Sequence, residues 1–356
     1  MFQILDETGH EVGPVPEGIG ETVLTDMLRM MIFGRHIDRK AISLQRRGKL
    51  GTFASALGQE AIGVGVASAM RTEDALFPSY REHAAQLVRG VRIDESLRYW
   101  GGDERGSDFA EARHDFPNCV PIATQVCHAA GAAYAFRLRG EPRVAVSFLG
   151  DGASSKGDFY EGLNFAAVWQ APLVVVVSNN QWAISVPRSA QTAAATLAQK
   201  AIAAGVEGVQ VDGNDIVAVH HVARQALAKA RAGGGPTLIE ALSYRLGDHT
   251  TADDAARYRD PAVVQEQWSF EPLTRLRNYL VKLGAWGPDK EEALAHDCAE
   301  TVNAGVEAYL ATPPPTTAAM FEHLFATLPA ALVAQRDEAL RFAPSRAGAQ
   351  RGGDHG

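Results

Sequence analysis

The sequence contains few cysteines, no excess of basic residues and no apolar run long enough to cross a membrane. Its three cysteines, Cys119, Cys127 and Cys298, show no CxxC spacing. This argues against a zinc site or a disulfide framework and fits a reducing compartment. The net charge of -8 argues against nucleic-acid binding. Because the N-terminal residues have neither a basic nor a long apolar segment, we expect no signal peptide and a cytoplasmic protein with no membrane partner.

Composition divides the chain into three segments. Residues 1–19, which include Pro14 and Pro16, are expected to form an irregular arm. Residues 20–340 are expected to fold as a single domain, since a chain of this size can bury roughly three quarters of its unfolded surface. Residues 341–356 are rich in Gly, Arg and Ala, which predicts a disordered tail.

From residue 121 onward, short apolar runs alternate with segments of helical periodicity. Because buried parallel strands read as continuous apolar runs, this alternation predicts an α/β fold, with a mostly parallel sheet covered by helices on both faces. Helical patterns at 21–47 and 84–101, and again at 261–310, predict helical additions before and after the α/β region. The predicted strands are 143–149, 173–177, 208–211 and 237–242.

An acid and an amide pair stand at the ends of two consecutive predicted strands. The triplet GDG follows the first strand, and the pair NN follows the second. Ligands of open parallel sheets bind at the carboxyl ends of the strands, and Mg²⁺ takes oxygen ligands with only one or two protein carboxylates. We therefore predict that Asp151 and Asn180, with one backbone carbonyl, bind a magnesium ion that carries a phosphorylated ligand.

The glycines of the triplet let the backbone turn tightly and approach a phosphate. The backbone amides of Gly152 and Ala153 are expected to donate to that phosphate. The simplest alternative, a tight turn without a ligand, does not account for the Asn pair at the same edge of the sheet. A P-loop is excluded because GxxxxGK[ST] is absent, and a Rossmann dinucleotide site is disfavoured because GxGxxG is absent.

The stretch from Gly150 to Asn180 resembles the thiamine diphosphate motif, GDG followed by a spacer and NN. The longer pattern GDGAxxxGDFYEGLNFA, with NNQWAIS after it, resembles the alpha subunit of the thiamine-dependent first component of 2-oxo acid dehydrogenase complexes. The similarity extends from about residue 22 to residue 340. It implies the thiamine-diphosphate-binding fold and three magnesium ligands, which are Asp151, Asn180 and the backbone carbonyl of Trp182.

The resemblance also implies residues that bind the cofactor. Tyr80-Arg81, in FPSYREHAAQLVRG, matches a pair that binds the diphosphate, and a guanidinium suits bidentate contact with phosphate. His249, in SYRLGDHTTADDAARYR, matches a His near the diphosphate and the reaction centre, and is the expected catalytic residue. Its neighbour Asp248 is expected to favour the charged imidazolium.

The segment VPIATQ precedes the predicted helix at 123–139. The family places this segment against the aminopyrimidine ring of the cofactor, where Ile122 would form an apolar wall; the alternative for Ile122 is an ordinary core position. Thr124 and Gln125 match positions that bind a structural K⁺ in some relatives. In one respect the chain departs from the family, because Ala54 stands where some relatives carry an active-site His.

The resemblance implies oxidative decarboxylation of a 2-oxo acid, for which thiamine diphosphate accepts the electrons. The acyl group then passes to a lipoyl group on the acyltransferase component of the complex. In the family, the Glu that activates the cofactor belongs to a beta subunit, and two alpha and two beta chains form a heterotetramer. We therefore expect this polypeptide to be inactive without its beta subunit.

The sequence leaves the substrate open. ISLQRRGKLGTFASALGQEA and PSYREH resemble bacterial pyruvate dehydrogenase alpha subunits, which would give acetyl-CoA and CO₂ in the whole complex. PIATQ, VDGND and MFEHLFATLP also resemble branched-chain 2-oxo acid dehydrogenases. We favour pyruvate, with branched-chain (2-oxoisovalerate) activity as the alternative. A non-catalytic assembly subunit and an NAD-binding dehydrogenase are weaker alternatives.

Overall fold

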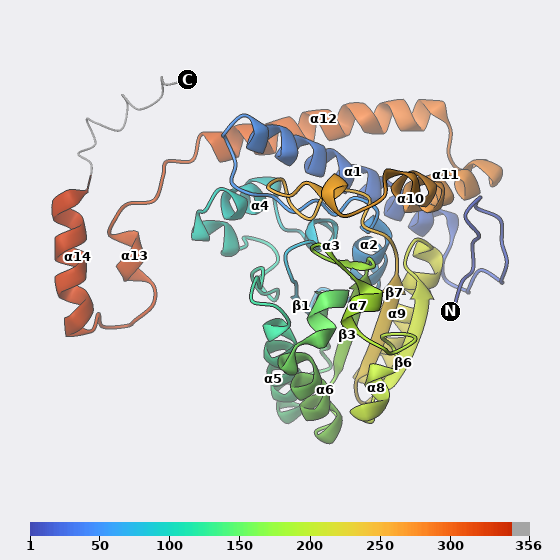
Figure 1. The fold of residues 1–356 in the computed structure, drawn as a ribbon, viewed down its shortest axis with the longest axis horizontal. Coiled ribbons are helices and arrows are strands. Elements are labelled where there is room, and N and C mark those ends of the chain that lie inside the picture. Colours follow the sequence, from blue (N-terminus) through green and yellow to red (C-terminus); the bar gives the residue numbers. More distant parts are fainter. Residues whose placement is uncertain (344–356) are drawn as a thin grey trace. The chain divides into compact units, whose positions relative to one another are not determined.

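The computed structural model describes residues 1–343. Met1–Leu310 form one compact unit, and the residues from Ala311 onward form a second. The centre of the first unit is a five-stranded sheet in which every neighbouring pair is parallel, in the order β1-β2-β3-β7-β6 (Figure 1). Its strands are β1 (Ala75–Phe77), β2 (Ala145–Gly150), β3 (Leu173–Asn179), β6 (Glu207–Asp212) and β7 (Thr237–Leu242).

The four strands predicted from apolar runs are β2, β3, β6 and β7, and each prediction is confirmed. Strand β1 was not predicted, because three residues are too few to give a recognisable run. A short antiparallel pair, β4 (Trp182–Ala183) and β5 (Val186–Pro187), was also not predicted. It lies between β3 and β6 in the chain.

Alternate residues of the strands enter two separate hydrophobic clusters, one on each face of the sheet. Val146 and Val176 pack with α2 (Glu60–Ala69) and α9 (Ile216–Arg231), whereas Ala145 and Val175 pack with the helices of the other face. Those helices are α5 (Thr124–Arg139) and α6 (Gly157–Val168). Since successive side chains of a strand point to opposite faces, the sheet is buried on both sides, as predicted.

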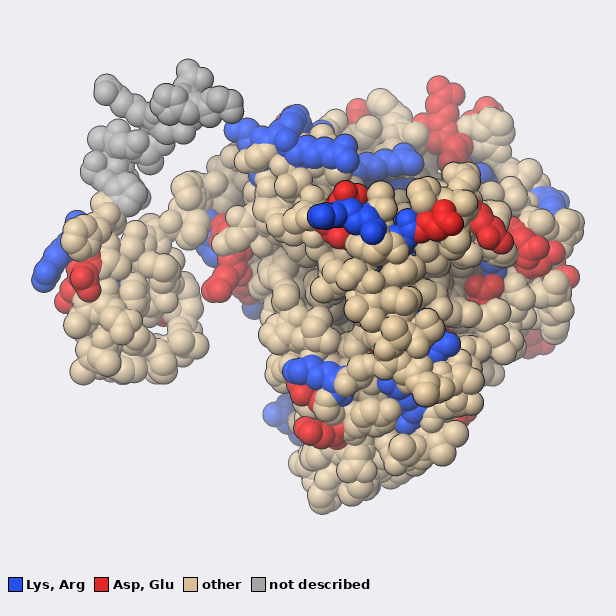
Figure 2. Space-filling view, in the orientation of Figure 1, with Lys and Arg blue, Asp and Glu red and all other residues tan. Residues whose placement is uncertain are grey.

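Helix α1 (Glu21–Arg46) is amphipathic and belongs to the helical addition before the sheet. Leu24, Leu28 and Met31 are buried at helical spacing and join the same cluster as α2 and α9. Basic residues occupy its outer face, and Figure 2 shows Lys and Arg side chains in a row over this helix. The apolar stripe therefore fixes which side of α1 packs on the rest of the unit.

The single helix predicted over 84–101 is two helices, because Gly90 adopts a positive φ of 95° between them. In the second unit the predicted domain end at 340 is not tested, and residues 344–356 of the predicted tail lie outside the described residues. No helix within residues 1–343 combines the length and apolar character needed to cross a bilayer.

The remaining helices are α3 (His83–Val88), α4 (Ile93–Trp100), α7 (Arg188–Gln191), α8 (Lys200–Ala203), α10 (Pro261–Gln267), α11 (Pro272–Lys282), α12 (Pro288–Leu310), α13 (Ala319–Glu322) and α14 (Ala330–Phe342). Short 3₁₀ segments are η1 (Glu104–Ser107), η2 (Asp151–Ser155), η3 (Ala255–Arg257) and η4 (Trp268–Phe270).

Asp215 attaches the N-terminal arm to the start of α9. One carboxylate oxygen, Oδ2, accepts the backbone N–H groups of Ile4 and Leu5 at 2.6 and 2.7 Å. The other oxygen, Oδ1, caps α9 by accepting the N–H groups of Val217 and Ala218. Because Asp215 is fully buried, no solvent can replace these contacts.

Substitution Asp215→Ala should lower the free energy of unfolding by about 2–4 kcal/mol, because it removes a helix cap and leaves buried N–H groups without an acceptor. Asp215→Asn retains one oxygen for the cap and should cost less. Guanidinium denaturation of both variants measures the difference. Equal stability of the Ala and Asn variants would contradict the interpretation that the two carboxylate oxygens separately stabilise the N-terminal arm and the start of α9.

Candidate active site

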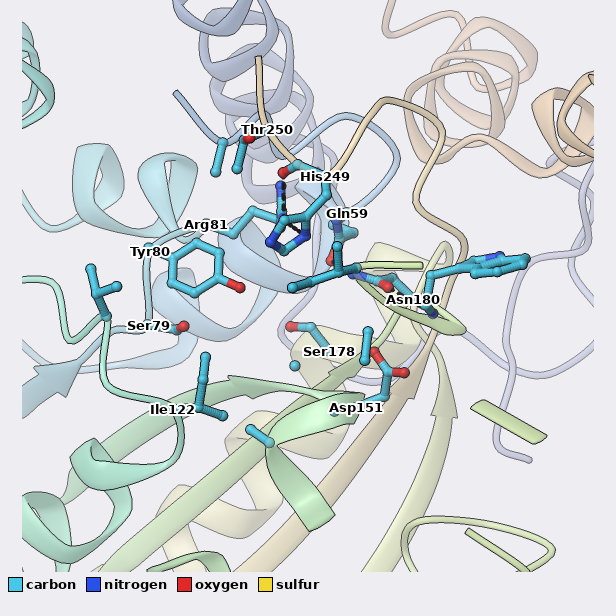
Figure 3. Close-up of a pocket in the computed structure, with 18 of the residues that line it drawn as sticks. Gln59, Ser79, Tyr80, Arg81, Ile122, Asp151, Ser178, Asn180, His249 and Thr250 are labelled. Atoms are coloured by element: carbon cyan, nitrogen blue, oxygen red, sulfur yellow. Dashed lines mark hydrogen bonds between the residues drawn. The ribbon is translucent and has the colours of Figure 1, made fainter. Parts of the chain in front are cut away.

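A cavity of about 580 Å³ lies where β2 and β3 end. Figure 3 shows side chains from several separate segments around this space. The structure thus brings together every residue that was predicted to bind the cofactor or its metal, although their roles as ligands stay predictions. These residues are Tyr80, Arg81, Ile122, Asp151, Gly152, Ala153, Asn180, Trp182 and His249.

Asp151 begins the 3₁₀ turn η2, directly after β2. It is only 2 % exposed, and burial raises its pKa to about 6. Its Oδ2 accepts a hydrogen bond from Gln191 Nε2 at 3.1 Å. The next residue must be glycine, because a Cβ at Gly152 would lie 2.6 Å from the Cβ of Ala183. The turn therefore presents one buried carboxylate on a closely packed backbone.

The two asparagines after β3 have different surroundings. Asn179 Nδ2 donates to Glu240 Oε1 at 2.7 Å, and the Asn179 side chain does not line the cavity. Asn180 does line it, and its Nδ2 donates to Gln59 Oε1 at 3.0 Å. The Oδ1 of Asn180 accepts the backbone N–H of Trp182 at 3.1 Å and has a second lone pair for a ligand.

The donor set at this edge suits a hard cation. Nowhere in residues 1–343 do three His, Cys, Asp or Glu side chains converge on one point. A metal in the cavity would therefore take the Asp151 carboxylate, the Asn180 amide oxygen and a backbone carbonyl, with phosphate oxygens completing its shell. One carboxylate among oxygen ligands is the arrangement that Mg²⁺ prefers, so the residues present fit a magnesium-bound diphosphate.

Arg81 supplies positive charge to the cavity. Its Nη1 donates to the carbonyl of Ser55 at 2.6 Å, and its Nη2 donates to the carbonyl of His249 at 2.9 Å. Within the described residues Arg81 forms no ion pair with a carboxylate. Its charge is therefore available to an anionic ligand, as the diphosphate role requires. The Tyr80 ring stands edge-on to the His249 ring, with centroids 6.1 Å apart.

His249 is neutral, and the prediction that Asp248 keeps it charged is wrong. The pKa of His249 is lowered to about 4, mainly by burial and also by the cations of Arg81 and Arg245, while Asp253 opposes the change. Asp248 does not oppose this effect, because its carboxylate accepts the N–H of Ala255 instead. Both arginines place an Nη atom near His249 Nδ1, at 3.1 and 3.4 Å.

Arg245 is a buried residue of the site that the sequence analysis missed. It is 1 % exposed, and its Nη2 donates to the carbonyl of Ile184 at 2.9 Å. Its Nη1 lies 3.4 Å from the carbonyl oxygen of Trp182, the predicted third metal ligand. The one available signal was its position four residues before His249 in the same loop.

The segment before α5 forms one wall of the cavity. Ile122 is 41 % exposed and lines the cavity, so the alternative of an ordinary core position is wrong. Thr124 and Gln125 do not line it: their side chains donate to Asp158 and to the carbonyl of Phe148. The family comparison does not support the expected K⁺ site at these two residues. Ala54, which stands in place of a His, lies on the cavity wall.

Backbone strain gathers around this cavity. Four non-glycine residues within 1–343 have positive φ, and three of them are Ala123 (65°), Gln181 (71°) and Ile184 (54°). Ala123 and Ile184 line the cavity directly. A positive φ is most costly for a β-branched residue such as Ile184. Strain of this kind persists where a binding site requires a particular backbone geometry.

Other residues that line the cavity were not predicted individually from the sequence. They are Thr52, Gln59, Ser79, Glu82, Trp100, Ser178, Ala183 and Thr250.

The fold and the site are those expected of a protein that binds a divalent cation and a phosphorylated ligand at the carboxyl edge of a parallel sheet. Residues 28–317 match the family model described as "Dehydrogenase E1 component", and the chain therefore belongs to this family. Membership implies thiamine diphosphate and Mg²⁺ as cofactors.

Two relatives illustrate the similarity. The pyruvate dehydrogenase E1 component subunit alpha of Staphylococcus aureus is 40% identical over 338 residues, which cover 94% of this chain and 91% of that protein. The 3-methyl-2-oxobutanoate dehydrogenase subunit alpha of Mycobacterium tuberculosis is 43% identical over 318 residues, which cover 89% of this chain and 87% of that protein. The two relatives are named for different substrates, and their sequence identities are too similar to indicate which substrate this chain uses.

The His249 ring should remain neutral down to about pH 5, because its pKa is lowered to about 4. Arg81→Met should raise this pKa, since it removes one of the two cations beside the ring. Lys156→Met, which removes an exposed cation outside the cavity, should leave it unchanged. Nuclear magnetic resonance of ¹⁵N-histidine-labelled protein, assigned with His249→Gln, measures the titration. A midpoint between about pH 6 and 7 in the unmodified protein would contradict the expectation.

Proposed function

We propose that the chain is the alpha subunit of an acetyl-transferring pyruvate dehydrogenase, which decarboxylates pyruvate oxidatively and acylates a lipoyl group on the acyltransferase component. The observation that carries this proposal is the convergence of nine residues, from segments far apart in the sequence, on one cavity at the end of β2 and β3. The S. aureus relative, named for pyruvate, supports the substrate.

In this proposal the metal is held by Asp151, Asn180 and the carbonyl of Trp182. Tyr80 and Arg81 donate to the diphosphate. The amides of Gly152 and Ala153 do so as well, and Ile122 forms the apolar wall beside the aminopyrimidine. When bound, thiamine diphosphate supplies the electron acceptor for decarboxylation.

His249 is the proposed catalytic residue. Arg81 and Arg245 are obligate donors and both face Nδ1, so Nδ1 is the acceptor and the neutral ring carries its proton on Nε2. A neutral imidazole with a proton on Nε2 can donate a hydrogen bond to a substrate oxygen without adding a third positive charge. The two arginines thus set which nitrogen acts on the substrate.

The mouth of the cavity supports a partner subunit. Val120, Ile122 and Ile184 are 53, 41 and 55 % exposed although all three are apolar. Apolar groups around a reaction site that must exclude water suit coverage by another chain. We propose the beta subunit of the same component as that chain, in an alpha₂-beta₂ heterotetramer. The cysteines, all unpaired in the structure, support a cytoplasmic location.

The second candidate is a branched-chain 2-oxo acid dehydrogenase alpha subunit. The M. tuberculosis relative, named for 3-methyl-2-oxobutanoate, supports it. Ala54 on the cavity wall favours it as well, because a small side chain there leaves room for a larger acyl group. An apolar pocket distinguishes substrates that differ by one methylene by only about 1–3 kcal/mol. A non-catalytic assembly subunit is disfavoured, since Asp151, Asn180, Arg81 and His249 are all present at the cavity.

Co-expression with the beta subunit should give an enzyme whose kcat/KM for pyruvate exceeds that for 3-methyl-2-oxobutanoate by about tenfold or more. The alpha chain alone should show no decarboxylation, because part of the site would be missing. The reverse preference would select the branched-chain alternative. Robust turnover by the isolated alpha chain would contradict the proposed division between subunits.

Thiamine diphosphate with Mg²⁺ should stabilise the alpha–beta complex by roughly 2.7 kcal/mol when the cofactor is at about 100 times its dissociation constant. NAD should have no effect. Asp151→Ala should abolish the stabilisation, because it removes the single carboxylate ligand. Asp158→Ala, which changes an aspartate of the same segment outside the cavity, should retain it. Thermal unfolding with each ligand and with each variant measures these effects. A shift of the unfolding temperature in Asp151→Ala as large as in the unmodified complex would rule out the metal assignment.

A further inference from the structure

Gln59 is a buried residue at the cavity with an unused hydrogen-bond donor. It stands directly before α2 and is 6 % exposed. Its Oε1 accepts a hydrogen bond from Asn180 Nδ2 at 3.0 Å, whereas its Nε2 has no partner. A buried amide N–H without an acceptor is unfavourable. The unused donor therefore indicates that a ligand supplies the acceptor.

Gln59 also determines how the Asn180 amide is oriented. An Asn side chain carries one oxygen and one NH₂ group, and exchanging them requires rotation of the amide. Gln59 Oε1 accepts from the NH₂ group, while the N–H of Trp182 donates to the oxygen. Both bonds favour the same orientation, so Asn180 Oδ1 is kept available as a metal ligand.

The carboxylates next to Gln59 are already engaged. Glu60 accepts from the guanidinium of Arg35 at 2.8 Å and from the N–H of Gly58 at 2.9 Å. Glu82 accepts from the N–H of Arg81 at 3.2 Å. Neither is hydrogen-bonded to Gln59 Nε2 in the structure, so the missing acceptor has to come from outside this group.

The surroundings of Gln59 indicate the chemistry of that acceptor. Gln59 and Asn180, which are joined by a hydrogen bond, lie at the wall of the cavity (Figure 3), and Arg81 lines the same cavity. A guanidinium and an amide donor beside a metal-binding amide suit the oxygens of a diphosphate. The competing acceptor is a water molecule in the space of about 10 Å³ between Gln59, Glu60 and Glu82, which is near the lower limit for one water.

We propose that Gln59 has two functions in the binding of the cofactor, an inference that rests on the proposed function. Its Oε1 holds the Asn180 oxygen toward the metal, and its Nε2 donates to the diphosphate. The first function makes Gln59 a positioning residue for the metal ligand. The second makes it a further cofactor-binding residue, contributed by the segment that begins α2.

Two substitutions separate these functions. Gln59→Glu has nearly the same shape and keeps an oxygen that accepts from Asn180, but it loses the donor and brings a negative charge toward the diphosphate. Gln59→Leu loses both the acceptor and the donor. The control is Gln86→Leu, because Gln86 is 3 % exposed and also hydrogen-bonds an asparagine, Asn118, at 3.0 Å, but does not line the cavity.

The experiment measures dissociation constants by calorimetry in the alpha–beta complex, at about pH 8 so that the new carboxyl is ionised. Thiamine diphosphate is titrated at saturating Mg²⁺, and Mg²⁺ is titrated at saturating thiamine diphosphate. Gln59→Glu should raise the dissociation constant of thiamine diphosphate about 10- to 100-fold and change that of Mg²⁺ by less than about threefold. Gln59→Leu should raise both dissociation constants about 10- to 100-fold, which is the range expected when a group that supports a metal ligand is lost. Gln86→Leu should change neither.

The outcomes are distinct. If the unmodified complex does not bind thiamine diphosphate with Mg²⁺, the proposed function itself is wrong. If the unmodified complex binds and Gln59→Glu binds thiamine diphosphate within about twofold of it, Nε2 donates only to water and the inference is overturned. If Gln59→Leu fails to assemble, Gln59→Glu alone decides. Equal weakening by Gln86→Leu would reduce the effect to general destabilisation and also overturn the inference.

Discussion

The parallel pairing of β2 with β3 is the constraint on which the site depends. Its register sets Gly150 opposite Ser178, so Asp151 and Asn180 leave the sheet at the same edge, one residue after Gly150 and two after Ser178. All seven residues of β3 are buried, and packing on both faces of the sheet holds the strand in this position. A carboxylate and an amide oxygen therefore reach one cavity as a result of sheet packing, with no direct bond between them in the structure.

The charges around the cavity are unbalanced in a way that suits its proposed ligand. Arg81 and Arg245 are both buried, and neither forms an ion pair with a carboxylate in the described part of the chain. Asp151 is also buried, and burial raises its pKa to about 6. Buried charges are costly unless paired, so a divalent ion on Asp151 and a diphosphate near Arg81 would each supply a missing partner. Burial and the same cations lower the pKa of His249, which would connect the binding of the cofactor to the protonation state of the proposed catalytic ring.

Residues at the cavity could be identified from the sequence where local pattern and spatial position coincide. Continuous apolar runs predicted four strands of the sheet, and strand ends identified Asp151 and Asn180; resemblance supplied Tyr80, Arg81 and His249. Predictions from the sequence were wrong or missing where the role of a residue depends on the direction of its side chain. Asp248 is adjacent to His249 in the chain but bonds elsewhere, so the predicted charge on the ring was wrong. Gln59 was missed because only folding brings it to the cavity. For Arg245 the one signal was its position four residues before His249.

Strained backbone and an unused hydrogen-bond donor lie together at the cavity. Ala123 and Ile184 keep positive φ angles, Gln59 Nε2 lacks an acceptor, and Arg81 forms no ion pair with a carboxylate of residues 1–343. Each feature is unfavourable in the protein without ligand, and each lies at the cavity rather than in the core formed by the sheet and its helices. A well-packed core can tolerate such local costs, because the stability of the fold comes from the buried strands and helices. A bound ligand would supply the missing hydrogen-bond acceptor and the missing negative charge. Tighter binding of the cofactor should therefore be accompanied by greater stability of the complex.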